Sequence, residues 1–294
     1  MRILLTGATG FLGTSLLDYF LRHNHEVLII KRATTDLSQL YQRFGNIEAL
    51  NSDNLSYIAA IHPKIDLIVH AATDYGHNST IPTSVFWANE AFPIGLLELA
   101  ISQKINFFNI DTFFNSKKTK YGYLGSYTLS KRHFQEWGEH CANVGKIKFF
   151  NFKLFHLYGP GDNFNKFVPT IVQRCLMGEE INLTDGIQAR DFIYISDAVD
   201  AVGAILESIE MQKPKYHNYD VGTGVSTSIR EFVEMVKRFS SSSSKLNFGV
   251  LPNRMGEIQN IVARTENLRS LGWRPRIGIE AGIKNIIKDI DRRK

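Results

Sequence analysis

Arg2-Ile3-Leu4-Leu5-Thr6-Gly7-Ala8-Thr9-Gly10-Phe11-Leu12-Gly13 is the stretch of sequence that decides the fold. Its apolar run from Ile3 to Leu5 is typical of a strand buried on both faces, and the apolar spacing after Leu12 is typical of a helix. Between them three glycines recur at every third position, one residue longer than the common G-x-G-x-x-G pattern. A helix that begins after such a turn offers N–H groups and the positive end of its dipole to a pyrophosphate. The stretch therefore predicts the first half of a dinucleotide-binding βαβ unit.

Each of the three glycines has its own role in such a loop. Gly7 allows the tight turn, Gly10 lets a phosphate approach the backbone, and Gly13 lets the helix pack closely on the strand. An ordinary turn of an α/β protein is the alternative interpretation. The position of the loop directly after a strand favours the cofactor site.

A second buried strand, at 26–30, ends at two basic residues, Lys31 and Arg32. In a βαβ site an acidic residue at this strand end binds the ribose 2′-hydroxyl of the adenosine, whereas a basic residue accommodates a 2′-phosphate. The sequence therefore favours NADP(H) over NAD(H). The alternative is a pair of surface cations at the start of a loop.

Strands and helices alternate through the first half of the chain. Strands are predicted at 66–72, 104–110 and 148–155, a long helix opens at Asn89, and another covers 126–143. Such alternation indicates an α/β fold of the Rossmann type, with a doubly wound parallel sheet. Because ligands of these sheets lie at the carboxyl ends of the strands, we expect the ends after Leu5, Ile30, His70 and Ile110 to lie together.

The second half mixes short strands with helices predicted at 167–177, 196–207 and 228–239, the last capped by Ser226 or Ser228. We expect a dinucleotide-binding domain made of 1–158 with 191–220. The remaining residues, 159–190 with 221–294, are expected to form a smaller mixed α/β lobe that binds the substrate.

Composition excludes several classes of protein. The 294 residues carry 34 basic and 29 acidic side chains, a formal charge of +5, but the basic residues are scattered apart from two short runs, at 117–120 and 292–294. We therefore expect no nucleic-acid partner, and a mild positive excess suits an anionic small ligand.

The two cysteines, Cys141 and Cys175, are far apart, which argues against a disulfide or a metal site. No apolar run approaches the length of a membrane span, and the cytoplasm is the expected compartment.

Tyr127 and Lys131 are four residues apart on the predicted helix 126–143, so they share one face. A free phenol has a pKa near 10, and a neighbouring cation stabilises the phenolate and lowers that pKa. The spacing alone also fits an amphipathic surface pair. Thr112, which ends a strand fifteen residues before Tyr127, and the glycine loop favour a proton-transfer site.

Many motifs along the chain occur in the order of one known family, and nearly the whole chain resembles the extended short-chain dehydrogenase/reductases of nucleotide-sugar metabolism. The motifs are Thr6–Gly13, Asp66–Ala72, Asn89, Thr112, Tyr127 with Lys131, Tyr158–Gly161, Arg190–Tyr194, Val221–Gly224 and Leu271–Pro275.

This resemblance implies the roles of the central residues. It makes Tyr127 the proton donor and acceptor at the sugar oxygen, and Lys131 the ligand of the nicotinamide ribose. Thr112 then hydrogen-bonds the reacting oxygen, and Asn89 supports the lysine through water. The implied cofactor contacts are Gly7, Thr9, Gly10, Phe11, Leu12, Lys31, Arg32, Ala71, Ala72, Tyr127 and Lys131.

The resemblance also narrows the chemistry. Members that remove water from the sugar follow the threonine with Asp-Glu, but here Phe113 and Phe114 follow Thr112, and phenyl rings move no protons. Members that epimerise two carbons carry an added Cys/His pair, which neither cysteine position supports. Hydride exchange at one carbon remains, either a net reduction or an NAD-retaining 4-epimerisation, and the basic strand end favours the reductase. A non-catalytic dinucleotide-binding sensor is a further alternative, which the intact Thr112, Tyr127 and Lys131 oppose.

Within the family, the segments 111–115, 126–137 and 155–160 are similar to the CDP-abequose and CDP-paratose synthases, which reduce a 4-keto-3,6-dideoxy sugar on CDP for O-antigen synthesis. Related reductases act on dTDP-linked 4-keto-6-deoxy sugars. By resemblance, Arg190 and Arg254 clamp the substrate diphosphate, as bidentate guanidinium groups do well. Other implied substrate contacts are Asp74, Tyr75, His156, Lys166 and Phe167. Many relatives form homodimers by packing two helices per subunit, and the apolar faces of the predicted helices 89–101 and 126–141 would permit this here.

Overall fold

The computed structural model describes residues 1–54, 64–76, 83–115, 124–209, 215–254 and 256–292. The chain divides into two compact units. The first unit comprises described residues of Met1–Lys117, Leu124–Lys153 and Glu207–Tyr219. The second comprises those of Leu154–Leu206 and Asp220–Lys294. The binding roles that we expect of two domains remain predictions.

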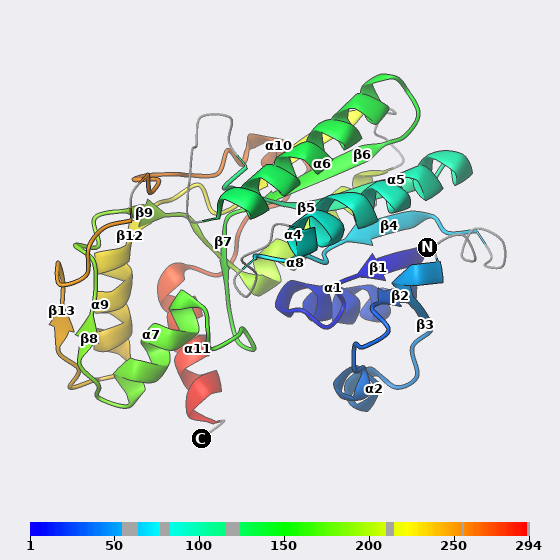
Figure 1. Ribbon diagram of the computed structural model, residues 1–294. Coiled ribbons are helices and arrows are strands. Elements are labelled where there is room, and N and C mark those ends of the chain that lie inside the picture. Colours follow the sequence, from blue (N-terminus) through cyan, green and yellow to red (C-terminus); the bar gives the residue numbers. More distant parts are fainter. Residues whose placement is uncertain (55–63, 77–82, 116–123, 210–214, 255, 293–294) are drawn as a thin grey trace. The chain divides into compact units, whose positions relative to one another are not determined.

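A seven-stranded sheet forms the centre of the first unit, with the order β11-β6-β5-β4-β1-β2-β3 (Figure 1). Neighbouring pairs from β3 to β5 run parallel, and the order reverses direction at β1, as in dinucleotide-binding sheets. The predicted fold class is therefore confirmed. The strands are β1 (Arg2–Thr6), β2 (Glu26–Lys31), β3 (Ala49–Asn51), β4 (Leu67–His70), β5 (Asn106–Thr112), β6 (Phe149–Leu154) and β11 (Tyr216–Val221).

Helices cover both faces of this sheet. Helix α1 (Phe11–Arg22) lies on one side, and α5 (Phe92–Gln103) and α6 (Gly125–Asn143) lie next to each other on the opposite side (Figure 1). Alternate strand residues such as Leu4 and Phe107 pack with α5 and α6 in one buried cluster. Burying each large apolar side chain contributes about 1.5–3 kcal/mol, so this cluster fixes α6 against the sheet. The short helix α2 (Ser38–Phe44) and the turn η1 (Ser52–Asn54) complete the described elements of this unit's N-terminal part.

The helix before α5 differs from the expectation. Asn89 does not open a helix: α4 (Thr83–Phe86) already begins one, and η2 (Trp87–Ala91) joins it to α5 as a π-helical turn. The cause lies in the sequence, since Pro93 has no N–H to donate to the carbonyl of Asn89. Instead the N–H of Phe92 donates to the carbonyl of Trp87, five residues back. Single π-turns of this kind are frequent at functional sites.

The second unit is built from three two-stranded ladders and five helices among its described residues. Its core surrounds Tyr158, whose ring is fully buried against Phe192 and Phe232, and Gly282 leaves the room that the phenol needs. The predicted cap is confirmed, since Ser228 and Glu231 form a capping box. The strands are β7 (His156–Tyr158), β8 (Ile181–Asn182), β9 (Ala189–Arg190), β10 (Phe192–Tyr194), β12 (Thr227–Ser228) and β13 (Leu246–Asn247). The helices are α7 (Phe167–Leu176), α8 (Ile195–Ser208), α9 (Ile229–Phe239), α10 (Glu266–Ser270) and α11 (Ile279–Asp291).

Candidate active site

The carboxyl ends of the central strands lie along one edge of the sheet, as expected from the alternation of strands and helices. Thr6 at the end of β1 pairs in register with Ile30 of β2 and with His70 of β4. His70 in turn pairs with Asn109 of β5. This edge therefore brings the glycine loop, the basic strand end and Thr112 to one side of the first unit.

The glycine loop packs closely against the backbone of the segment after β4. Gly7 has a positive φ of 73°, and a Cβ there would lie 2.6 Å from the backbone nitrogen of Ala72, so only glycine fits. A Cβ on Gly13 would overlap the carbonyl of Gly7. Gly10 is exposed and precedes α1, and no side chain caps this helix end. An open helix N-terminus behind exposed glycine backbone fits the pyrophosphate of a dinucleotide.

The two basic residues at the end of β2 differ in their surroundings. The ammonium of Lys31 turns back to the carbonyls of Arg32 and Ala33, each 3.4 Å away, and Arg32 is exposed. Two cations therefore occupy the strand end where the cofactor's ribose is expected. Their contact with a 2′-phosphate remains a prediction.

The predicted proton-transfer residues come together where α6 passes the end of β5. Tyr127 and Lys131 lie on the buried face of α6, and the phenol hydrogen-bonds the Thr112 hydroxyl. The ammonium of Lys131 donates to the carbonyl of Ile110 at 2.5 Å. The four-residue spacing seen in the sequence thus turns both side chains of α6 toward the end of β5.

Burial dominates the electrostatics of this pair. It raises the pKa of Tyr127 well above its usual range, and Tyr75 and Asp111 act in the same direction. Only the hydrogen bond with Thr112 lowers this pKa, so the expectation that Lys131 brings it toward neutrality is wrong for this structure. Burial also lowers the pKa of Lys131 to about 8, against the opposing charge of Asp111. At neutral pH the site therefore holds a protonated phenol.

Asn89 is buried in the π-turn η2, and its side chain hydrogen-bonds the segment after β4 and helix α6. Its amide donates to the carbonyl of Asp74 at 2.8 Å and to the hydroxyl of Ser130 at 3.2 Å. Its oxygen accepts from the backbone N–H of Asp74 and from the hydroxyl of Thr73. These contacts tie the segment after β4 to α6 beside Lys131. Water-mediated support of Lys131 remains a prediction.

Two predicted substrate contacts lie in this same unit. The ring of Tyr75 is 39% exposed and lies 4.9 Å from the ring of Tyr127, centre to centre. Asp74 accepts a hydrogen bond from the N–H of Gly76 and so closes a turn. The structure thus brings Tyr75, a predicted substrate residue, against the phenol of Tyr127.

The other predicted substrate contacts belong to the second unit. Arg190 is buried, and its guanidinium forms an ion pair with Glu257 at 2.8 Å and donates to the carbonyls of Ala189 and Ile258. A diphosphate that bound Arg190 would therefore compete with Glu257. Arg254 is exposed and lies on the same segment as Glu257.

His156 and Lys166 also lie in the second unit. Burial, with Arg190 and Lys166 adding, lowers the pKa of His156 to about 3, so the imidazole is neutral at physiological pH. Lys166 forms an ion pair with Asp162 at 2.9 Å and immediately precedes Phe167, the first residue of α7. Their substrate contacts remain predictions.

Sequence reasoning missed the polar residues on the interior of β5. Asn109 and Asp111 are both buried, and neither was assigned a role. The available signal is their position two residues apart in the strand, on either side of Ile110, which places both on one face.

Neither a metal centre nor a membrane span is found in the part of the chain that the structure describes. No group of three or more His, Cys, Asp and Glu residues in these ranges is able to hold a metal ion. No helix in the same ranges is long and apolar enough to cross a membrane.

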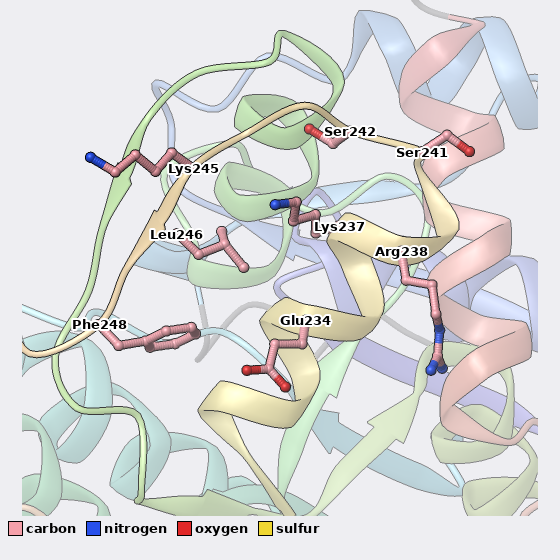
Figure 2. A pocket seen from close by; sticks show the side chains of 8 residues that line it. All are labelled: Glu234, Lys237, Arg238, Ser241, Ser242, Lys245, Leu246 and Phe248. Carbon is pink, nitrogen blue, oxygen red and sulfur yellow. The ribbon is translucent and has the colours of Figure 1, made fainter.

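A surface hollow of about 670 Å³ in the second unit is separate from the predicted residues (Figure 2). It is lined by α9 and the segment that follows, and two of its cations already have carboxylate partners: Arg238 pairs with Glu280 and Lys245 with Glu180. None of the residues predicted to bind cofactor or substrate lines it.

Comparison with known proteins places the chain in context. A sequence model described as the NAD dependent epimerase/dehydratase family matches residues 3–222. The chain is 35% identical over 294 residues to CDP-abequose synthase of Salmonella typhimurium, covering 97% of each chain, and 36% identical to that of Salmonella muenchen, again with 97% of each chain covered.

Solved structures share the fold. UDP-glucose 4-epimerase of Thermotoga maritima, with UDP-glucose, has a TM-score of 0.86 at 20% identity and covers 100% of this chain and 99% of its own. UDP-glucuronic acid 4-epimerase of Bacillus cereus, in complex with a UDP-sugar analogue and NAD, has a TM-score of 0.86 at 22% identity over the whole of both chains.

Proposed function

This chain belongs to the NAD dependent epimerase/dehydratase family, and from that premise we propose that the enzyme uses NADPH to reduce the 4-keto group of a nucleotide-linked sugar. It is an NAD(P)-dependent enzyme of the oxidoreductase type, and over its length it is related to CDP-abequose synthase. The proposed substrate is a CDP- or dTDP-linked 6-deoxy or 3,6-dideoxy sugar. The similarity to CDP-abequose synthase supports the CDP-linked form.

One observation carries the proposal for reduction. Phe113 and Phe114 follow Thr112 directly, with their rings 4.1 Å apart, and Phe113 is buried. Neither ring moves a proton, so the strand end offers no acid–base pair for removing water from the sugar. A buried phenol beside a threonine hydroxyl provides one proton for one oxygen, which is what reduction of a ketone requires.

In the proposed mechanism, residues of this chain transfer the proton to the sugar oxygen. A bound nicotinamide dinucleotide supplies the hydride. Tyr127, protonated at neutral pH, donates its proton to the oxygen of the sugar carbonyl as negative charge develops there. Thr112 hydrogen-bonds the same oxygen as well as the phenol, and the ammonium of Lys131 would bind the nicotinamide ribose.

Binding of the cofactor is proposed for the glycine loop and the two cations at the end of β2. The N-terminus of α1 would hold the pyrophosphate, Ala71 and Ala72 would allow the backbone to approach it, and Lys31 and Arg32 would select the 2′-phosphate. An enzyme that draws on the NADPH pool is expected in the cytoplasm.

Self-association is proposed through the exposed side of α4, η2 and α6. Four large apolar residues lie exposed on these neighbouring elements of the first unit, and Trp87 and Trp137 are the most exposed, at 61% and 51%. Exposed apolar patches of this kind typically mark protein interfaces. The four residues are Phe86, Trp87, Leu129 and Trp137.

The test is NADPH consumption with CDP- and dTDP-linked 4-keto sugars, with the configuration of the product determined by NMR. Tyr127→Phe removes the proton donor and keeps the ring, so kcat should fall by roughly a hundred- to ten-thousandfold. Tyr41→Phe, at an exposed tyrosine of α2, is the matched control.

The two alternatives predict other results. A 4-epimerase would retain NAD through purification and turn over without added NADPH. A dinucleotide-binding sensor would bind NADPH and reduce none of the sugars. Equal rates for Tyr127→Phe and wild type would exclude the proposed proton donor.

A further inference from the structure

A closed ring of hydrogen-bonded side chains lies at the end of β5, next to the candidate active site. It joins β5, β6, β11 and α6 within the first unit, and its bonds are 2.7–3.3 Å long. In ring order its members are Asp111, Asn115, Gln135, Tyr216, Asn218 and Asn151. Six side chains that hold each other in this way lose little freedom and fix the local backbone.

Asp111 is the charged member of this ring. Its Oδ2 accepts from the amides of Asn115 and Asn151, both at 2.9 Å, and its carboxylate is only 3% exposed. Its Oδ1 is buried and has no hydrogen-bond donor among the residues that the structure describes. Two neutral amides compensate poorly for burying a carboxylate, so a nearby cation is needed to stabilise the charge.

Asp111 lies between two residues of β5 that contact the proposed catalytic side chains. The carbonyl before it, of Ile110, accepts the hydrogen bond of the Lys131 ammonium. The residue after it, Thr112, holds the Tyr127 phenol, and the N–H of Asn115 donates to the carbonyl of Thr112. Whatever fixes Asp111 therefore also fixes the positions of Lys131 and Tyr127.

We infer that Asp111 is a positioning residue whose ring-held carboxylate orients the Ile110–Thr112 strand end and sets a negative charge beside the carbonyl that binds Lys131. This inference rests on the proposed roles of Tyr127 and Lys131. The asparagines and the glutamine of the ring are neutral, so their hydrogen bonds hold the side chains in place without adding charge. Asp111 supplies the negative charge.

The other titratable groups around the site do not take the place of Asp111. His70 on β4 is buried, and burial, followed by the charge of Lys131, keeps its pKa well below the usual range, so it stays neutral. Tyr127 on α6 is protonated, and Tyr216 on β11 has a pKa raised by burial, then by Glu139 and Asp111. Asp111 is the carboxylate that opposes the desolvation of Lys131.

The experiment is an NMR pH titration of the full-length protein labelled with 15N-lysine, with the Lys131 signal assigned by its loss in Lys131→Met. Asp111→Asn keeps both acceptor contacts and removes the charge, so the titration midpoint of Lys131 should fall by about one pH unit or more. Asn218→Ala, which breaks the ring without changing its charge, is the matched control and should leave the midpoint in place.

Activity gives a second readout with a defined sign. Lys131 is charged below its pKa of about 8, so wild-type kcat should decline as pH rises through that value. In Asp111→Asn the decline should occur at lower pH, because the lysine loses its proton earlier. Asp111→Ser serves as a second neutral variant.

Several results would overturn the inference. One is a lower melting temperature with an unchanged lysine midpoint, and another is an equal shift in Asn218→Ala. A third is failure of both neutral variants to fold, since the charge would then serve folding alone. The NMR titration uses no sugar, so failure of the proposed reduction would leave its result readable.

Discussion

At the scale of single residues, the site combines a buried phenol, a buried ammonium and a buried carboxylate on one strand end and one helix. The Tyr127–Lys131 spacing and the strand-end threonine were readable in the sequence because both follow from helical and strand periodicity. The pKa of Tyr127 was not, because desolvation depends on everything that surrounds the phenol. Asp111 was overlooked for the same reason, since its partners come from distant parts of the chain.

The choice of cofactor is also decided by single residues. Replacing Lys31 and Arg32 together by alanine removes the cations expected at the 2′-phosphate, so the Kd for NADPH should rise roughly ten- to a hundredfold. The Kd for NADH should change little. Fluorescence titration of both cofactors measures this, with Arg43→Ala, an exposed arginine on α2, as control. A parallel loss of affinity for both cofactors would contradict selection of the phosphate.

At the scale of elements, the position of α6 depends on one close contact with the sheet. Gly138 faces Phe149 of β6, and a Cβ at this position would overlap the phenyl ring. That ring is fully buried and stacks on Phe107 at 5.3 Å, so it has little room to move. A helix that carries Tyr127 and Lys131 is therefore held at a distance that only glycine allows.

Gly138→Ala should lower the free energy of unfolding by about 1–3 kcal/mol, because overpacking forces the ring or the helix to shift. Gly125→Ala is the matched control on the same helix, since a Cβ there meets open space and alanine favours helix. Denaturant unfolding followed by circular dichroism compares the two. Equal stability of Gly138→Ala and wild type would mean that α6 tolerates displacement from the sheet.

The elements themselves were predicted unevenly. Strands buried on both faces, such as β1 and β4, and the capped helix α9 were recovered from apolar runs and turn residues. The edge strand β11 was missed, since its sequence Tyr-His-Asn-Tyr-Asp-Val is mostly polar and half-buried. The start of the helix before α5 was misplaced because the π-turn is a local departure from α-helical winding, which apolar periodicity alone does not reveal.

At the scale of the whole molecule, the proposed dimer and the catalytic group share the same helices. The exposed indoles of Trp87 and Trp137 belong to η2 and α6, whose buried faces carry Asn89, Tyr127 and Lys131. Association would therefore restrain the helices that hold the proton-transfer residues. The sequence alone was least informative about self-association, because an exposed apolar face does not identify the partner that binds it.

Changing both Trp87 and Trp137 to glutamate should convert a wild-type dimer into monomers, since two charges would have to be buried at the interface. Light scattering after size-exclusion chromatography gives the mass directly. Ile187→Glu, at an exposed apolar residue of the second unit, should leave the mass unchanged. A wild-type protein that is already monomeric would contradict the proposed interface.

The π-turn has a consequence for how this helix tolerates insertions and deletions. It accommodates one residue more than regular α-helical winding, and each residue turns a helix by about 100°. Deleting that residue would rotate everything before Pro93 by this angle relative to α5. Asn89 would then leave the interior as Trp87 left the surface. Pro93 thus sets the orientation of Asn89 and Trp87 relative to α5, with the amide facing inward and the indole facing outward. Variants with a residue inserted or deleted in this segment should lose both orientations together.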